Sequence, residues 1–257
     1  MTRLNKHKIN NLLKIAPKGS VLTTSWLKNH GISNKLAWWY IKSGWFDRIA
    51  DGAYSFTGNN ITWAGAISAV QQQLKLPIYP GGKTALQLLG KGHYISMDFQ
   101  IIQLFAAPKT KIPRWLQTPY WKESLIVYRP ALFKKEDNAW LATIEITGQS
   151  LMVSSPEKAS LELCYLVPNI VTFSEAALII EGLPRMRPKL LQSLLEACQS
   201  YKAKRLLLYL GEYFQHPWVV DIDLNRVDLG KGKRVIAGGG HYNDKYKISV
   251  PMLGNRE

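Results

Sequence analysis

Apolar positions near the start of the chain recur at the spacing of a helix. They predict a helix from about Lys6 to Ile15, and the side chains expected on its inward face are Ile9, Leu12, Leu13 and Ala16. The segment Pro17-Lys18-Gly19 ends this helix, because proline and glycine interrupt a helical pattern. The chain therefore begins with a short amphipathic helix followed by a break.

Two further short helices are expected after this break. Thr24 is expected to cap the first of them, because a threonine hydroxyl can accept a free backbone N–H of the first helical turn. Gly31 ends that helix, and Ser33 caps a third helix that runs to about Ser43. Two helices joined by a short turn containing glycine form a helix-turn-helix, whose second helix enters the major groove of DNA.

The third helix has one apolar side and one polar side. Ala37, Tyr40 and Ile41 have the spacing of an inward-facing stripe, and the opposite side carries Asn34, Lys35, Trp38 and Lys42. Asparagine can bind adenine through two hydrogen bonds, and lysine can reach guanine or phosphate. Tryptophan is unusual on a groove-facing helix, so the alternative is that Trp38 or Trp39 packs into the core of the module.

The dipeptide Asp51-Gly52 separates two short apolar runs, 46–49 and 53–56, which is a strong hairpin pattern. The hairpin forms the wing of a winged helix, and Arg48 is the wing residue expected near phosphate. The residues expected to contact DNA are Thr24, Ser33, Asn34, Lys35, Trp38, Lys42 and Arg48. Such a module binds DNA mainly through backbone charge, with specificity from a few base contacts. The alternative is a winged helix that contacts another protein, because a fold does not by itself fix function.

The rest of the chain predicts a mixture of helices and strands. Helices are expected at 59–74, 83–89, 156–166, 173–181, 188–201 and 203–213, and strands at 101–106, 124–128, 143–147, 151–154, 219–224, 234–237 and 246–250. Pro156 suits the first turn of one of these helices. We expect an α+β fold in which residues 1–57 form a winged helix-turn-helix and residues 58–257 form a mixed α/β C-terminal domain.

Charge favours a nucleic-acid partner. The 257 residues carry a net charge of +15, and residues 1–57 carry nine Lys or Arg against two acids, a local net charge of +7. A solvated basic face is the plain alternative, but the charge coincides with the helix-turn-helix pattern. Double-stranded DNA is therefore the expected partner.

Cysteine usage and apolar runs bear on the compartment. Cys164 and Cys198 lie in apolar helical patterns and are expected to be buried thiols. The N-terminus has no apolar signal-peptide core, and no apolar run approaches the roughly 20 residues that span a bilayer. We expect a soluble cytoplasmic chain without a membrane partner.

Patterns for catalysis are weak. Gly82-Lys83-Thr84 resembles the end of a phosphate-binding loop, but Pro77 occupies the position where that loop needs its first glycine. Asp221 and Asp223 would share one face of a strand and could hold Mg²⁺; the plainer interpretation is the polar face of a half-buried strand. The histidines show no metal-ligand spacing and no nucleophile elbow is present. No catalytic residue, metal or cofactor is predicted.

A second basic segment lies near the C-terminus. It contains Lys231, Lys233 and Arg234, and Gly238-Gly239-Gly240 follows it. Basic hairpin turns explain it in the ordinary way, and a second nucleic-acid surface is the functional alternative.

Four segments, taken in order, resemble the AbiEi family, the antitoxins of type IV toxin–antitoxin (abortive infection) systems. They are the winged module ending at 51–54, Gly81–Gly90, Ser155–Ala159, and 228–234 with 242–246. The resemblance implies a winged helix that binds inverted repeats in its own promoter and represses the operon, and a C-terminal domain responsible for antitoxicity. It also implies a nucleotidyltransferase-like toxin that is countered without a stable complex. The chain departs from the expected basic recognition helix at Trp38-Trp39-Tyr40.

Three functions remain to be compared. The first is a DNA-binding autorepressor and antitoxin that is not an enzyme. The second is a metal-dependent nucleic-acid-processing enzyme that uses Asp221 and Asp223, and the third is a winged-helix adaptor that binds proteins.

Overall fold

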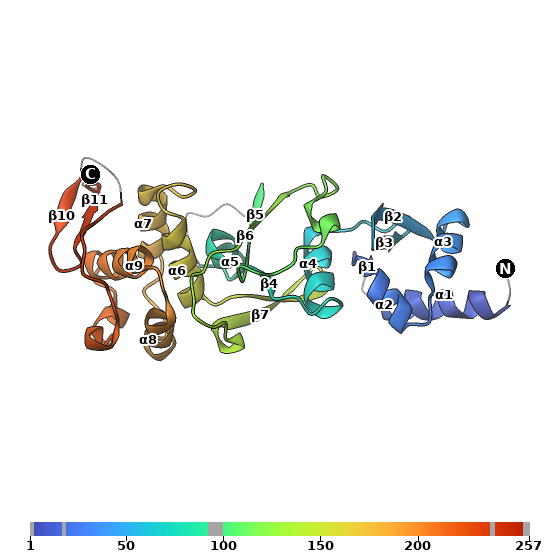
Figure 1. Cartoon of the computed structure of the whole chain (residues 1–257), viewed down its shortest axis with the longest axis horizontal. Coiled ribbons are helices and arrows are strands. Elements are labelled where there is room, and N and C mark those ends of the chain that lie inside the picture. The colour runs from blue at the N-terminus through green and yellow to red at the C-terminus, as the bar shows by residue number, and fades with distance from the viewer. Residues whose placement is uncertain (1–2, 17–18, 92–99, 237–239, 254–257) are drawn as a thin grey trace. The chain divides into compact units, whose positions relative to one another are not determined.

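The computed structural model describes residues 3–16, 19–91, 100–236 and 240–253, with the side chains of the first helix described from Lys8 onward. Its helices are α1 (Arg3–Ile15), α2 (Thr24–Asn29), α3 (Asn34–Lys42), α4 (Trp63–Gln72), α5 (Gly82–Leu88), α6 (Pro156–Leu166), α7 (Phe173–Glu181), α8 (Pro188–Ala197) and α9 (Tyr201–Tyr213) (Figure 1). Short 3₁₀ helices are η1 (Arg114–Gln117), η2 (Asn138–Trp140), η3 (Pro217–Val219) and η4 (Leu224–Arg226).

The strands are β1 (Leu22–Thr23), β2 (Phe46–Ala50), β3 (Ala53–Phe56), β4 (Ile78–Pro80), β5 (Ile101–Ala106), β6 (Ser124–Tyr128), β7 (Leu141–Ile146), β8 (Gln149–Ser154), β9 (Arg234–Val235), β10 (His241–Asn243) and β11 (Ile248–Val250). The fold is mixed α and β, with a helix-turn-helix at its N-terminal end, so the predicted fold class is confirmed.

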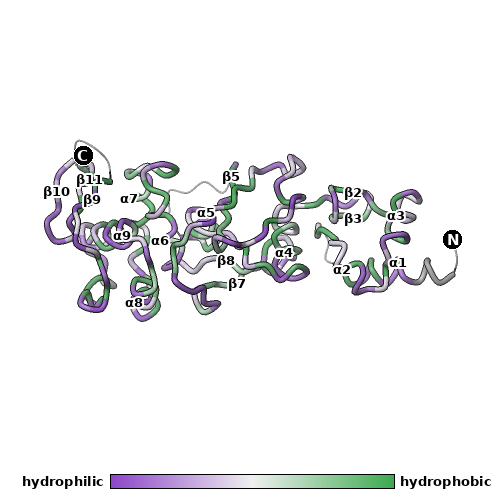
Figure 2. The backbone as a smooth tube through the Cα atoms, viewed as in Figure 1, coloured by the Kyte–Doolittle hydropathy of each residue, from purple (hydrophilic) through white to green (hydrophobic). Residues whose placement is uncertain are grey.

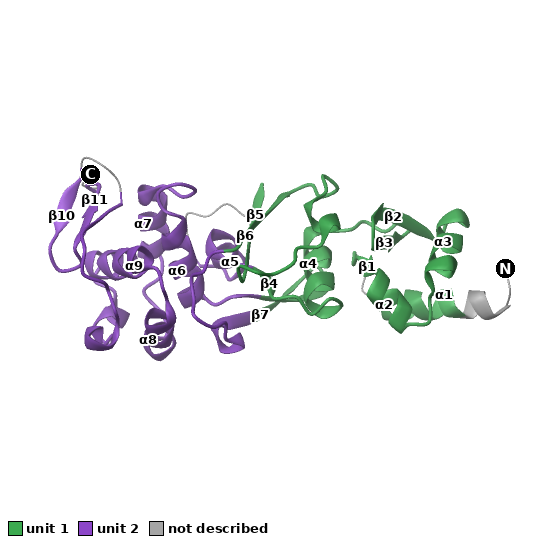
Figure 3. Cartoon of the chain, in the orientation of Figure 1, with its two compact units in different colours: residues 1–79, 100–129, 143–152 green, residues 80–99, 130–142, 153–257 purple. Residues whose placement is uncertain are grey.

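The residues divide into two compact units. The first holds Met1–Tyr79, Gln100–Arg129 and Thr143–Met152, and the second holds Pro80–Phe99, Pro130–Ala142 and Val153–Glu257 (Figure 3). The chain therefore passes between the units more than once. The division into functional domains after residue 57 stays a prediction.

A small antiparallel sheet and three helices form the winged module of the first unit. The sheet has the order β1-β3-β2, with Leu22 opposite Tyr54 and Phe46 opposite Phe56. Gly52 has φ +81° at the turn between β2 and β3, a conformation that glycine adopts without strain, so the predicted hairpin is confirmed.

The core of this module joins all three helices to the sheet. Its buried members are Ile9, Leu12, Leu22, Leu27, Ile32, Ala37, Tyr40 and Phe46, with Ala16 packed against them. The prediction that Leu13 shares the inward face was wrong, because its side chain is 48% exposed. Among the described side chains of α1, Ile9 and Leu12 are the buried apolar ones, and Ala16, just after the helix, is partly buried against them.

The cap of α2 lies one residue earlier than predicted. Thr23, in extended conformation, accepts the Trp26 N–H on its hydroxyl, and Thr24 is the first helical residue, so the assignment of the cap to Thr24 was wrong. Burial decides the position of the cap, because the buried side chain of Thr23 lies within reach of the third backbone amide of α2. Ser33 caps α3 as predicted, accepting the Leu36 N–H at 3.2 Å.

Helix α4 is buried along almost its whole length, and its apolar sequence is visible in Figure 2. Thr62 caps it by accepting the Gly65 N–H on its hydroxyl at 3.1 Å, so α4 starts at Trp63 and is shorter than the helix predicted from 59. Gly65 faces the start of the winged module: a Cβ there would lie 1.9 Å from the Gly19 oxygen.

A glutamine just after α4 connects it to the winged module. The Gln73 oxygen accepts the Thr23 N–H and the Thr23 hydroxyl, both at 2.9 Å, and the Gln73 amide nitrogen donates to the Val21 oxygen at 2.7 Å. Asn59 accepts the Gly19 N–H at 3.3 Å. These bonds pair main-chain groups at the edge of the module with side chains beyond residue 57.

Two further strand groups lie largely in the first unit. One is the sheet β4-β5-β6, in which β5 and β6 are parallel and Ile101 lies opposite Ser124. The other is the hairpin β7-β8, with Thr147 and Gly148 at positive φ in its turn. β7 begins at Leu141, two residues before the strand predicted at 143–147, and it ends at Ile146 because Thr147 turns the chain.

Helix α6 is the centre of the second unit and packs against α5, α7, α8 and α9. Its predicted bounds are confirmed; Ser155 caps it and Pro156 occupies its first turn. Cys164 is buried within it, whereas Cys198 is the buried cap residue at the end of α8, and both are free thiols. The helix predicted to reach Tyr201 therefore stops at Ala197, and α9 starts at Tyr201.

The strand predicted at 219–224 is wrong. Pro217 starts the 3₁₀ helix η3, and the Asp223 carboxylate accepts the Asn225 N–H at 3.0 Å to begin η4. Val220, within the predicted strand, is 88% exposed. The terminal sheet instead has the order β10-β11-β9, with β9 and β11 parallel.

Candidate nucleic-acid interface

The outward face of α3 carries the predicted contact residues together. Asn34, Lys35, Trp38 and Lys42 are exposed, while Ala37 and Tyr40 are buried beneath them. Trp38 is 59% exposed, whereas Trp39 is half-buried against the module core. The helix therefore uses one tryptophan for packing and presents the other to solvent.

The turn before α3 is held in place by short contacts. Gly31 has φ +75°, and its carbonyl accepts the Lys8 ammonium from α1 at 2.9 Å. Ile32 is buried, whereas Gly31 and Ser33 on either side of it are exposed. An open hollow lies at this turn, lined by Lys28, Gly31, Ile32, Ser33, Asn34 and Lys35.

Two lysines of α3 are available to a polyanion. Among the described residues, neither Lys35 nor Lys42 forms an ion pair. The Lys42 ammonium lies 5.5 Å from the centre of the Trp38 ring, a cation–π distance. The face thus combines an amide, an indole and two cations.

The wing differs from the expectation in its electrostatics. Arg48 pairs with Asp51 at the hairpin tip, where both side chains are largely exposed. An exposed ion pair of this kind contributes little stability, so phosphate could displace the carboxylate at small cost. Thr24 lies beside the wing: its N–H donates to the Gly52 oxygen at 3.0 Å, which links α2 to the hairpin.

The second basic segment forms an exposed loop of the second unit. Lys231, Lys233 and Arg234 are all exposed, and the Lys233 ammonium lies 4.8 Å from the centre of the Tyr242 ring. Gly238 and Gly239 lie outside the described residues.

A buried arginine shapes this loop. Arg205 is 1% exposed, and its guanidinium donates to the carbonyls of Leu229, Gly230, Gly232 and Lys247 at 2.6 to 3.1 Å. These bonds draw four carbonyls inward, and the neighbouring cationic side chains remain in solvent. Sequence reasoning missed Arg205, because its four partners lie at least 24 residues away.

The paired aspartates do not form the arrangement that a metal site needs. Asp221 and Asp223 line a cleft of about 910 Å³ beside α8, together with Arg187, Lys189 and Arg226. Their strand does not exist, so the geometric basis for one shared face is gone. Among the described residues, no group of three or more His, Cys, Asp or Glu side chains is placed to hold a metal ion.

A buried carboxylate of the second unit joins one of the sequence motifs to α6. The Glu162 carboxylate accepts the Gly82 N–H at 2.9 Å and the Ser154 hydroxyl at 3.0 Å, which joins the segment 81–90 to α6. Burial raises the pKa of Glu162 to about 7, against the opposing charge of Lys158. Lys158 itself is fully buried and pairs with Glu136.

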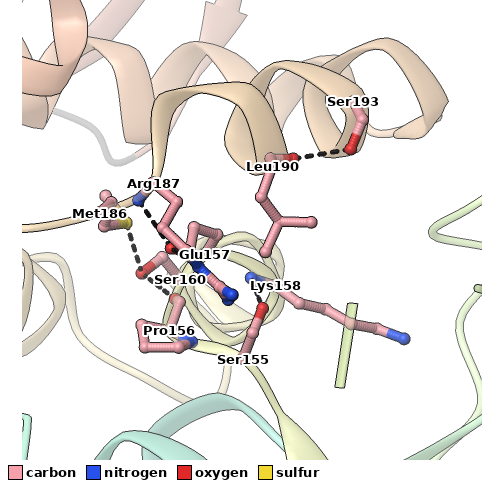
Figure 4. A network of polar contacts seen from close by, with 9 residues as sticks. All are labelled: Ser155, Pro156, Glu157, Lys158, Ser160, Met186, Arg187, Leu190 and Ser193. Atoms are coloured by element: carbon pink, nitrogen blue, oxygen red, sulfur yellow. Dashed lines mark hydrogen bonds and ion pairs between the residues drawn. The ribbon is translucent and has the colours of Figure 1, made fainter. Parts of the chain in front are cut away.

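The motif 155–159 connects α6 to α8 through Glu157. Glu157 is buried and accepts three hydrogen bonds from Arg187, two from the guanidinium and one from the backbone (Figure 4). Although burial alone raises its pKa, the bonds from Arg187 hold the pKa of Glu157 below its usual range. The sequence did not indicate this pair, because Arg187 lies thirty residues along the chain from Glu157.

Within the described residues, no helix has the length and apolar character that crossing a bilayer would require.

Comparisons with known proteins agree with this architecture. A family model described as transcriptional regulator, AbiEi antitoxin, type IV TA system, matches residues 100–251, and one described as transcriptional regulator, AbiEi antitoxin N-terminal domain, matches residues 5–97. No curated protein matches the chain. The crystal structure of the RV2827C protein from Mycobacterium tuberculosis is similar, with a TM-score of 0.63 and 14% identity, covering 96% of this chain and 91% of that one. At that identity the likeness concerns the fold alone.

Proposed function

We propose that this chain, which belongs to the AbiEi antitoxin family of transcriptional regulators, binds the promoter of its own operon and represses it. In this proposal residues 1–57 bind inverted repeats in double-stranded DNA, and α3 enters the major groove. Regulation proceeds by binding in the cytoplasm, without a catalytic step or cofactor.

One observation carries the proposal: the exposed face of α3. Asn34 and Lys35 lie at the start of that helix, the part that reaches base edges in helix-turn-helix proteins. Lys42 lies in its last turn and is free of acidic partners among the described residues, so it suits a phosphate contact. Arg48 on the wing adds a second phosphate contact once it leaves Asp51.

The first test is a gel-shift titration of a labelled promoter fragment. The double variant Lys35→Ala/Lys42→Ala is expected to bind at least about tenfold more weakly than wild type, because each good contact contributes on the order of 1–3 kcal/mol. The slope of log K against log salt should also become shallower, by about 0.9 per lost phosphate contact. Lys109→Ala/Lys111→Ala is the matched control, because it removes the same charge from an exposed loop outside the winged module. Equal binding by the α3 double variant and wild type would show that α3 is not the DNA surface.

We also propose that residues 58–257 counteract a nucleotidyltransferase-like toxin without forming a stable complex with it. Support comes from the antitoxin family and from the buried polar network of the second unit. The toxin is expected to be encoded by the neighbouring gene, and co-expression of this chain should restore the growth of cells that express the toxin. In an affinity-column experiment, the tagged toxin should not retain this chain. Lys35→Ala/Lys42→Ala, expressed from an independent promoter, should still protect the cells. Failure of wild type to protect, or stable co-purification, would contradict this part of the proposal.

A further inference from the structure

The exposed face of α3 contains one continuous ridge. Asn34, Trp38 and Lys42 follow one another at intervals of four, so their side chains lie along one side of the helix. At 1.5 Å per residue the ridge is about 12 Å long, which matches three to four base-pair steps of about 3.4 Å. Trp38 is at its centre.

The module does not need the Trp38 ring for its own packing. Tyr40 is fully buried and Trp39 is half-buried, so the neighbouring aromatics supply the core, while more than half of Trp38 faces solvent. The Lys42 ammonium over the ring places a positive charge beside the indole. An aromatic surface with an attached cation, in the middle of a groove-facing ridge, is placed to meet DNA rather than protein core.

The chemistry of the groove narrows what the indole can contact. Base faces in a duplex are stacked, so a side chain in the major groove meets only base edges. The hydrogen-bonding groups of those edges are polar, and the C5 methyl group of thymine is the prominent apolar group in the major groove. We propose that Trp38 is a specificity-determining residue that packs its indole on a thymine methyl, while Lys42 contacts the adjacent phosphate. This inference rests on the proposed function and adds to it a preference for thymine at the centre of the ridge.

Asn34, one helical turn before Trp38, can provide a second base contact. Its amide can form two hydrogen bonds with adenine in the major groove. Asn34 and Trp38 are four residues apart, about 6 Å along the helix, so the ridge favours a half-site in which an adenine and a thymine lie about two base pairs apart. Lys35, beside the ridge, adds a guanine or phosphate contact.

The test removes the methyl group without changing the pairing. Promoter fragments are prepared with thymine or with uracil throughout, and the affinities of wild type, Trp38→Ala and Leu13→Ala are measured by fluorescence anisotropy. Wild type is expected to bind the uracil fragment about fourfold more weakly for each contacted methyl. Trp38→Ala should lose this discrimination. Leu13→Ala removes a similarly exposed apolar side chain from α1, outside the ridge, and should keep it.

Wild type and Trp38→Ala, each measured on the thymine and the uracil fragment, form a double-mutant cycle. The cycle isolates the contact between Trp38 and the methyl group, because any other effect of uracil changes the affinity of both proteins equally. Circular dichroism checks that Trp38→Ala is folded, and Trp38→Gln provides a second variant of larger size. Discrimination that persists in both Trp38 variants, or no discrimination by wild type, overturns the inference. If Trp38→Ala instead changes the oligomeric state in sedimentation without DNA, Trp38 is a contact between copies of the chain. If wild type binds the thymine-containing promoter fragment no more tightly than a fragment of scrambled sequence, the proposed function itself is contradicted.

Discussion

Gly65→Ala is a demanding test of how α4 supports the winged module. A Cβ at this position would lie 1.9 Å from the Gly19 oxygen, 2.7 Å from its carbonyl carbon and 3.1 Å from the Ser20 Cα. All three atoms belong to the backbone, so no side-chain rotation can relieve the contact. The Gly19 carbonyl would have to retreat by more than about 1 Å to reach even the closest separation found in proteins.

Two opposing effects set the magnitude. Alanine is a better helix former than glycine, which favours the variant by roughly 0.5–1 kcal/mol. Overpacking costs typically 1–3 kcal/mol. A shift of the backbone at 19–20 also strains the hydrogen bonds that the Gly19 N–H donates to Asn59 and the Thr23 N–H donates to Gln73, each contributing about 1 kcal/mol. Gly65→Ala is therefore expected to lower the free energy of unfolding by about 1–3 kcal/mol, whereas helix propensity alone would raise it.

Urea unfolding followed by tryptophan fluorescence measures this loss, and hydrogen exchange of the Thr23 amide locates it. Gly232→Ala is the control, because a Cβ there meets nothing within 4 Å, and its stability should stay within about 0.5 kcal/mol of wild type. A Gly65→Ala chain as stable as wild type, with an unchanged Thr23 exchange rate, would refute the argument that this backbone contact is tight.

The remaining predictions concern the buried carboxylates of the second unit. The pKa of Glu162 is about 7 in the folded state against an ordinary 4.5, so the folded chain holds a proton that the unfolded chain has lost, and stability falls as pH rises from about 4.5 through 7. Glu162→Gln should flatten that fall in urea titrations between pH 5 and 8; an unchanged slope would contradict the assignment. Arg187→Ala removes the guanidinium donors of the buried Glu157 and should lower the free energy of unfolding by roughly 1–3 kcal/mol at pH 7. If the loss caused by Arg187→Ala is just as large in a Glu157→Gln background, the double-mutant cycle contradicts the pairing.

Local patterns were sufficient wherever the determinants of structure are adjacent in the sequence. Ser155 and Pro156 define the start of α6, and Asp51-Gly52 defines the wing, because caps and tight turns depend on neighbouring residues. The exposed face of α3 also followed from spacing alone. The cap at Thr23 rather than Thr24 shows the limit of such reasoning: two adjacent threonines have equal chemistry, and burial of one decides between them.

Errors and omissions arose where distant residues decide the outcome. The alternation of apolar and acidic residues at 219–224 imitated a strand, but Pro217 and the carboxylate of Asp223 turn the chain instead. Glu162 and Gly82 are 80 residues apart, Glu157 and Arg187 are 30 residues apart, and Arg205 is at least 24 residues from each of its partners. No periodicity connects positions so far apart, so the polar network of the second unit could be found only in three dimensions.

The interior cations change what the overall charge of +15 means. Lys158, Lys204 and Arg205 contribute to that total, yet each is at most 2% exposed. Their charge is offset by nearby carboxylates, aromatic rings and carbonyl dipoles rather than by mobile counterions. Retention on a cation-exchange resin should therefore depend on the exposed lysines and arginines. In a lysine-labelling footprint, Lys158 and Lys204 should stay unmodified with or without DNA, which makes them internal standards against which protection of Lys35 and Lys42 can be judged.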